Sequence, residues 1–268
     1  MNNLHRNLAP ISDAAWADIE QEASRTLRRY LAGRRVVDVP EARGVGLAAV
    51  DTGHTARIDS PADGVQALQR KVLPLVELRV PFSLSRDAID DVERGALDSD
   101  WQPLKDAARK IAYAEDRAIF DGYAAAGIRG IAQDTSNGQF SLPASPRDYP
   151  AIIADGLNEL RIAGVNGPYS VVLGARAFAA VSGGSEDGYP VLRHLERMIE
   201  GRIICAPAIE GAYILSTRGG DFELDIGQDV SIGYSSHSAT SVELYLQESF
   251  TFRVLTTEAS VVIRHAAA

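Results

Sequence analysis

The chain has 268 residues, of which 46% are hydrophobic and 24% are charged, so it is long enough to bury a sizeable core. Its 27 basic and 36 acidic residues give a net charge of −9, which argues against sequence-independent binding to nucleic-acid phosphates. No apolar run approaches the roughly 20 residues that cross a bilayer, and the N-terminus lacks the apolar core of a signal peptide. We therefore expect a cytoplasmic protein with no membrane span and no nucleic-acid partner.

The first predicted element is an amphipathic helix that begins at Ser12 and Asp13 and ends at Gly33. Its apolar residues recur at steps of three and four, the spacing of one helix face, and they are Trp16, Ile19, Ala23, Leu27 and Tyr30. A short strand is predicted over residues 34–39, where two valines follow two arginines.

Residues 40–75 have a different composition, with glycines and prolines between short alternating runs. This pattern predicts an extension with hairpin character and little core of its own. A long arm of this kind is unusual in a compact chain, so we expect a neighbouring subunit to cover it.

The remaining chain alternates between strands and helices. A strand is predicted over residues 75–82, and a helix of about 39 Å over residues 100–126. Residues 135–221 predict a compact α/β subdomain, and residues 242–254 alternate as a strand with one face apolar. Glu248 is the exception on that apolar face, and a carboxylate there predicts an ion pair at an interface.

Two motifs suggest catalysis, and neither has the context that its chemistry needs. Residues 44–49 fit a G-x-G-x-x-A dinucleotide fingerprint, but the residues that follow break the required helix. Asp51, Thr52 and Gly53 match the tripeptide of aspartic proteases, whose mechanism needs two carboxylates that share a proton. A dimer could supply the second carboxylate, while the plainer alternative is a hairpin turn.

No other pattern predicts a catalytic residue, a bound metal or a cofactor. The five histidines are scattered, the acids between residues 87 and 100 lack the spacing of a calcium loop, and Cys205 is the single cysteine. The absence of a catalytic set favours a structural role over an enzymatic one.

The sequence also resembles a known family along most of its length. The matching segments are residues 8–10 before the first helix, 33–39, 75–82, 93–95, 115–116 with 119–120, 167–169, 218–222, 227–229 with 231–234, and 248–252. These segments occur in order and at similar spacing from about Leu4 to Ile263, and together they are similar to the encapsulin shell proteins, above all the linocin-like actinobacterial members.

The resemblance implies an α+β protein with the HK97-type virus capsid fold. In that layout residues 1–39 hold the N-terminal helix and first strand, and residues 40–75 form an extended loop. Residues 76–132 are the peripheral domain with a spine helix, residues 133–222 are the axial domain, and residues 223–268 return to the peripheral domain. The resemblance further implies a closed icosahedral shell of about sixty copies or more.

Family members bind a short C-terminal peptide of their cargo enzyme on the inner face of the shell. Carried over to this sequence, the peptide-binding residues are Leu27, Arg34, Val36, Asp38, Ile226, Ile232 and Tyr234. Apolar pockets would take Leu, Ile or Val side chains of the peptide, while Arg34 and Asp38 fix its register. The alternative for these two residues is a mutual salt bridge. The expected cargo is a dye-decolourising peroxidase or a ferritin-like protein.

The resemblance also predicts a pore at the five-fold axis. Its loop is residues 185–189, which are Ser185, Glu186, Asp187, Gly188 and Tyr189, and five copies of the two acids would favour cations. The alternative is a polar surface turn. Some members hold a flavin against aromatic residues, but residues 84–89 contain no aromatic, so no flavin is predicted. The competing function is an aspartic-type protease or bacteriocin-like protein that acts as a dimer through Asp51.

Overall fold

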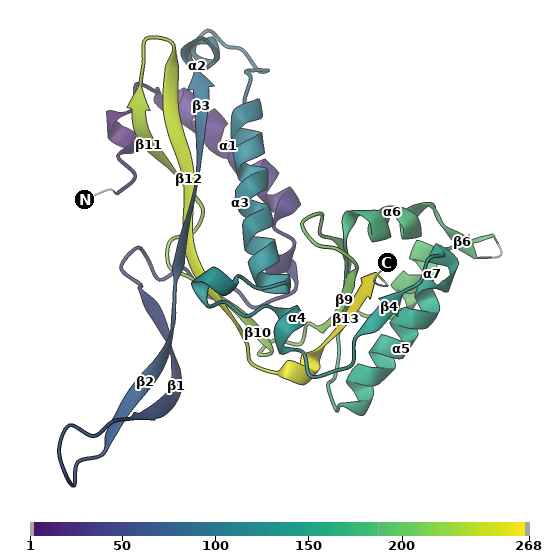
Figure 1. Ribbon diagram of the computed structural model, residues 1–268. Coiled ribbons are helices and arrows are strands. Elements are labelled where there is room, and N and C mark those ends of the chain that lie inside the picture. The colour runs from purple at the N-terminus through teal and green to yellow at the C-terminus, as the bar shows by residue number, and fades with distance from the viewer. Residues whose placement is uncertain (1–2, 187, 266–268) are drawn as a thin grey trace.

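The computed structural model describes residues 3–186 and 188–265, and these form two packed lobes and a projecting hairpin (Figure 1). One lobe is an elongated sheet covered by two long helices. The other is a five-stranded sheet with helices against it. The hairpin extends from the elongated lobe away from both cores.

The elongated lobe is built around one long strand, β12, which pairs with three others. All of these pairings are antiparallel, and the strands are β3 (Val76–Ser85), β10 (Phe222–Ile226), β11 (Ser231–His237) and β12 (Ser241–Val254). Leu244 and Leu246 of β12 are buried against the helices, as the alternation of its sequence predicts.

Helices α1 (Asp13–Tyr30) and α3 (Gln102–Phe120) pack side by side on this sheet, and α2 (Arg86–Glu93) closes its far end. The predicted first helix is confirmed as α1. Ser12 is its N-cap and accepts a hydrogen bond from the N–H of Ala15. The predicted spine helix is shorter than expected. It ends at Phe120 because Gly122 has a φ of +87°, and at 19 residues it is about 28 Å long.

The predicted strand over residues 34–39 is wrong. Residues Gly33–Arg35 form a turn of 3-10 helix instead, and only Asp38 pairs, through an isolated bridge to Glu223. The cause is close packing against α3. A Cβ at Gly33 would lie 2.6 Å from Ile119, and the Gly33 N–H donates to Asp116 at 2.8 Å.

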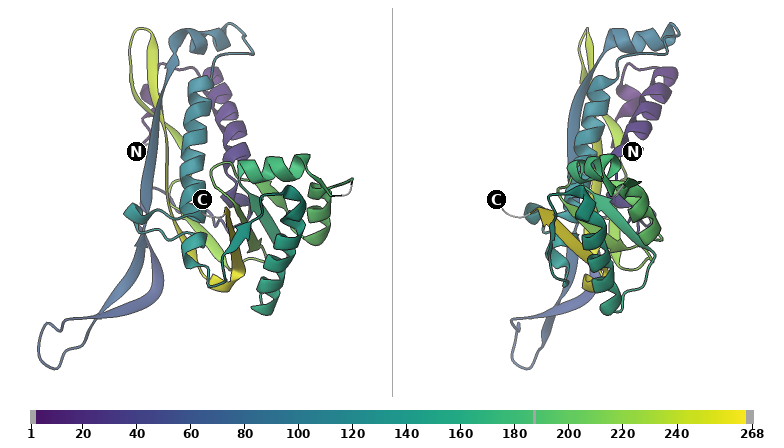
Figure 2. Two further views of the ribbon diagram at one scale, coloured as in Figure 1. Left: turned by 45° about the vertical axis from the view of Figure 1, so that its right-hand side comes forward. Right: turned by 90° about the vertical axis from the view of Figure 1, so that its right-hand side faces the viewer.

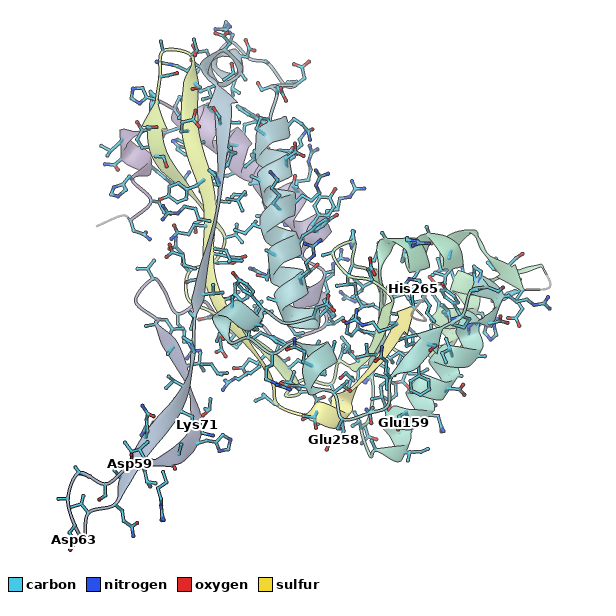
Figure 3. The ribbon with its side chains drawn as sticks, in the orientation of Figure 1. Asp59, Asp63, Lys71, Glu159, Glu258 and His265 are labelled. Carbon is cyan, nitrogen blue, oxygen red and sulfur yellow. The ribbon has the colours of Figure 1, made fainter. Side chains whose placement is uncertain are left out.

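The hairpin consists of β1 (Ala49–Ile58) and β2 (Ala67–Pro74), which pair with a bulge between Asp51 and Thr55. Its predicted hairpin character is confirmed. It projects from the body in every view of Figure 2, and Figure 3 shows Asp59, Asp63 and Lys71 along its outer half. The apolar side chains that it leaves exposed are Ile58, Val65, Leu68 and Val72.

The second lobe contains a sheet of order β4-β13-β9-β5-β8. Its strands are β4 (Phe140–Leu142), β5 (Tyr169–Leu173), β8 (Ile203–Cys205), β9 (Ala212–Ser216) and β13 (Ser260–His265). Its helices are α4 (Ile131–Asp134), α5 (Tyr149–Ile162), α6 (Ala175–Gly183) and α7 (Val191–Met198), and a two-residue hairpin pairs β6 (Ser185–Glu186) with β7 (Tyr189–Pro190).

Strand β13 joins this second sheet, where it pairs with β4 and β9. The last strand therefore lies with residues 133–222, whereas the sequence prediction grouped it with the peripheral strands. The division into domains otherwise stays a prediction. Among the described residues no helix is long and apolar enough to cross a membrane.

Candidate functional site

A groove with a volume of about 690 Å³ lies between α1 and the edge of β11. Its apolar lining comes from Ala23, Leu27 and Leu31 on α1 and from Val230 and Ile232 opposite. These residues line it because α1 turns one apolar face toward the sheet, while no described strand lies beyond β11 on that side.

Arg34 lines this groove and binds three carboxylates. Its Nε and Nη2 donate to Glu115 at 2.6–3.0 Å, and its Nη1 donates to Asp229 at 2.8 Å. Nη2 also lies 3.3 Å from Oε2 of Glu248. Arg34 thus connects the turn after α1 to α3, β12 and the loop before β11.

The charges around Arg34 do not balance, because one guanidinium faces Glu115 and Glu248, both fully buried, and the exposed Asp229. Within the described chain, Oε1 of Glu248 has no hydrogen-bond partner. Burial, and then the nearby carboxylate of Glu115, raise the pKa of Glu248 well above its usual value. A proton on Glu248 therefore relieves the excess of buried negative charge.

A second buried carboxylate, Asp116, lies beside this cluster. It accepts hydrogen bonds from the N–H groups of Ala32 at 3.1 Å and Gly33 at 2.8 Å, which fixes the turn after α1 against α3. Burial raises the pKa of Asp116 to about 7, although these two hydrogen bonds act in the opposite direction.

The seven predicted peptide-binding residues do not all meet at the groove. Leu27, Arg34 and Ile232 line it. Tyr234 lies further along β11, where its hydroxyl is 2.6 Å from Nδ1 of His237. Ile226 of β10 is buried in the hydrophobic core that continues into the second lobe.

Val36 and Asp38 line a separate small pocket of about 100 Å³. The carboxylate of Asp38 accepts a hydrogen bond from the N–H of Gly220 at 2.6 Å. Arg34 binds Glu115, Asp229 and Glu248 instead, so the alternative of a mutual Arg34–Asp38 salt bridge is wrong.

The sequence prediction missed Glu115 and Asp229, both of which hold Arg34. For Glu115 a signal was present. It stands four residues after Ile111 and three before Ala118, so helical spacing places it on the apolar face of α3. A buried carboxylate at such a position needs a cation.

The predicted pore residues form a small hairpin at the tip of the second lobe. Ser185 pairs with Pro190 and Glu186 with Tyr189, while Gly188 has a φ of +85°. Asp187 lies outside the described residues.

Three contacts tie this hairpin to α7. Glu186 is 3.0 Å from Nδ1 of His194, and the Tyr189 ring contacts His194 edge-on and lies under the guanidinium of Arg197. Whether five copies meet around a pore stays a prediction.

Asp51 is exposed on the hairpin β1–β2. It accepts a hydrogen bond from the N–H of Gly53 at 2.8 Å and forms an ion pair with Arg70 at 3.2 Å. The bond from Gly53 lowers the pKa of Asp51, with Arg70 adding to it. An arginine thus stands beside Asp51 where a protease would need a second carboxylate. The alternative of a hairpin turn is also wrong, because residues 51–53 lie inside strand β1, at the start of its bulge.

Across residues 3–186 and 188–265, no three His, Cys, Asp or Glu side chains are placed to hold a metal ion. Burial raises the pKa of the Cys205 thiol, which makes it a weak nucleophile.

The chain matches known proteins over nearly its whole length. Residues 1–251 match the family model Linocin_M18, described as encapsulating protein for peroxidase. Proteins named type 1 encapsulin shell protein are 60% identical in Rhodococcus erythropolis, covering 97% of this chain and 99% of that protein, and 56% identical in Mycobacterium tuberculosis, covering 99% and 100%.

Solved capsids and a virus-like particle are among the structures that the chain resembles. A virus-like particle from Pyrococcus furiosus has a TM-score of 0.62 at 18% identity and covers 93% of this chain and 99% of that one. The capsid of an empty GTA particle has a TM-score of 0.55 at 17% identity, covering 89% and 91%. The fold is therefore the HK97-type capsid fold in an α+β chain, as the sequence predicts. The family match and these relatives together show that the chain belongs to the family of encapsulating proteins for peroxidase and is a shell protein of the type 1 encapsulin kind.

Proposed function

We propose that this shell protein assembles with about sixty or more copies of itself into a closed icosahedral compartment in the cytoplasm. The observation that carries the proposal is the hairpin β1–β2, which leaves four large apolar side chains exposed and has no core of its own. Exposed apolar patches of this kind mark interaction surfaces. A second copy that covers the hairpin would bury them, in a role that is structural rather than enzymatic.

The compartment would enclose a dye-decolourising peroxidase or a ferritin-like protein. The name of the family model, encapsulating protein for peroxidase, supports the first of these. The groove between α1 and β11 would hold the C-terminal peptide of the cargo, with apolar side chains against Leu27 and Ile232 and with Arg34 in its lining. Val36, Asp38, Ile226 and Tyr234 would then support the groove from nearby without lining it.

The proposed peptide binding is tested with Leu27→Asp, which places a charged side chain on the face of α1 that lines the groove. A charged side chain in an apolar contact should lower peptide affinity by about tenfold or more. Leu97→Asp is the matched control, because Leu97 is fully exposed and lies outside the groove. The candidate peroxidase is co-expressed with each shell, and peroxidase activity is measured per milligram of purified shell. Equal loading of the two variants would contradict the assignment.

The hairpin of residues 185–189 would line the pore at the five-fold axis. Its Glu186 would face the mouth, with Nδ1 of His194 3.0 Å from the carboxylate. Such a ring would admit cations more readily than anions. Glu186→Gln should reduce the entry of a small cationic probe relative to an anionic one, and an unchanged ratio would favour the alternative of a polar surface turn.

A further inference from the structure

The edge of β11 beside the groove presents backbone groups that pair with no strand of the described residues. In the antiparallel register with β12, residues alternate between those whose backbone groups face β12 and those that face away. The N–H of Tyr234 donates to the carbonyl of Leu4, on the side away from β12. Ile232 stands two residues earlier, before the bulge of this strand, so its N–H and carbonyl face the same open side.

Both ends of this open edge are closed by the chain itself. At one end the N–H of Val230 donates to the carboxylate of Asp229 at 2.8 Å. At the other, the carbonyl of Leu4 takes the N–H of Tyr234 at 2.8 Å. Between them, the backbone of Ile232 receives no partner on that side from any described residue. The unpaired stretch is therefore short, and it opens into the groove that Ile232 lines.

The N-terminal segment that supplies Leu4 is firmly held. Asn3 donates to Gln228 at 3.0 Å, and its carbonyl lies 3.4 Å from the hydroxyl of Tyr245. Arg6 forms an ion pair with Glu20 at 2.5 Å and stacks over the ring of Trp16 at 4.1 Å. The segment spans from α1 to the sheet, and Leu4 and Arg6 both line the groove.

We infer that the groove takes a short extended peptide that adds a strand to the edge of β11, pairing with Ile232 and stopping where Leu4 occupies the edge. The inference rests on the proposed function, in which the groove holds a cargo peptide. The N-terminal segment already uses this edge in the same way, through a single backbone hydrogen bond. Edge pairing gives affinity through the main chain, while side-chain pockets give specificity.

This geometry defines the chemistry of the peptide. In a strand, alternate side chains point to the same face, so every second residue of the peptide would face Leu27 and the other apolar residues of α1. Those residues should be Leu, Ile or Val. The amides that pair with Ile232 must keep their N–H, so proline is excluded there.

The test is an N-methyl scan, which removes one backbone N–H of a peptide at a time. The probe is a fluorescein-labelled synthetic peptide with the C-terminal sequence of the peroxidase that mass spectrometry identifies inside native shells. Its binding to intact shells is followed by fluorescence anisotropy. We expect methylation of one or two alternate amides to weaken binding by about tenfold or more, and methylation of the amides between them to change it by less than about twofold.

The outcomes separate the inference from the function on which it rests. If the unmodified peptide fails to bind, the proposed peptide capture is wrong. If it binds and methylation shows no alternation, edge pairing is wrong and capture stands.

A chain lacking residues 2–7 should expose the edge at Tyr234 and add a further sensitive amide. If the shortened chain shows the same sensitive amides as the full-length chain, Leu4 does not limit how far the peptide pairs along β11. The scan on the full-length shell stands even if the shortened chain fails to assemble.

Discussion

Replacing Arg34 with leucine removes the one guanidinium that faces the buried carboxylates of Glu115 and Glu248. Arg34 makes five hydrogen-bond contacts, at 2.6–3.3 Å, to these two residues and to Asp229. Breaking a buried ion pair by removing one partner costs about 3–5 kcal/mol, because the remaining charge stays buried without compensation. A proton on Glu248 lessens the repulsion, so we expect a loss near the lower end of that range.

The assay is differential scanning fluorimetry of purified shells at pH 7. A loss of about 3 kcal/mol should lower Tm by about 6 °C or more, at roughly 2 °C or more per kcal/mol. Arg94→Leu is the control, because Arg94 pairs with Asp91 on the surface and such pairs contribute less than about 1 kcal/mol. The double variant Arg34→Leu/Glu248→Gln should recover part of the loss by removing one carboxylate. Equal Tm values for Arg34→Leu and Arg94→Leu would show that Arg34 does not compensate the buried carboxylates.

Three further predictions concern pH, assembly and the protease motif. The raised pKa values of Glu248 and Asp116 mean that their protonated forms stabilise the fold at low pH, and this contribution is lost as pH rises toward and past 7. The Tm of Glu248→Gln relative to that of the wild-type chain should therefore increase from pH 5 to pH 8. A relative Tm that decreases over this range would contradict the expected pH dependence. Val72→Asp, on the exposed hairpin, should leave a folded chain by circular dichroism but prevent assembly, whereas Leu97→Asp assembles; shells of normal size from Val72→Asp would count against the hairpin interface. Asp51→Asn should change neither assembly nor any trace of proteolysis in cargo-free shells, and a loss of proteolysis would revive the dimeric protease.

The parts of the fold that follow from local patterns are predictable from the sequence. The helix over Asp13–Tyr30 has a Ser12 cap and an apolar face of regular spacing, and the sequence of β12 alternates except at Glu248. The errors arise where tertiary packing overrides propensity. The valines after Arg35 favour a strand, but the fit of Gly33 under Ile119 and its bond to Asp116 impose a turn.

The candidate site is harder to predict because its parts are distant in the sequence. Glu248 stands out as a carboxylate on an apolar strand face, so a buried ion pair is predictable. Its partner, Arg34, lies 214 positions away, and nothing local points to it. The open backbone edge at Ile232 carries no side-chain signal at all, since it depends on which strand lies beside β11.

The central claim is that the chain builds a closed shell, and size-exclusion chromatography with multi-angle light scattering tests it most directly. A shell of about sixty copies of this 28.8 kDa chain would have a mass of roughly 1.7 MDa. A closed shell should elute as a single species at or above that mass. A monomer or dimer would contradict it and leave the exposed apolar side chains of the hairpin unexplained.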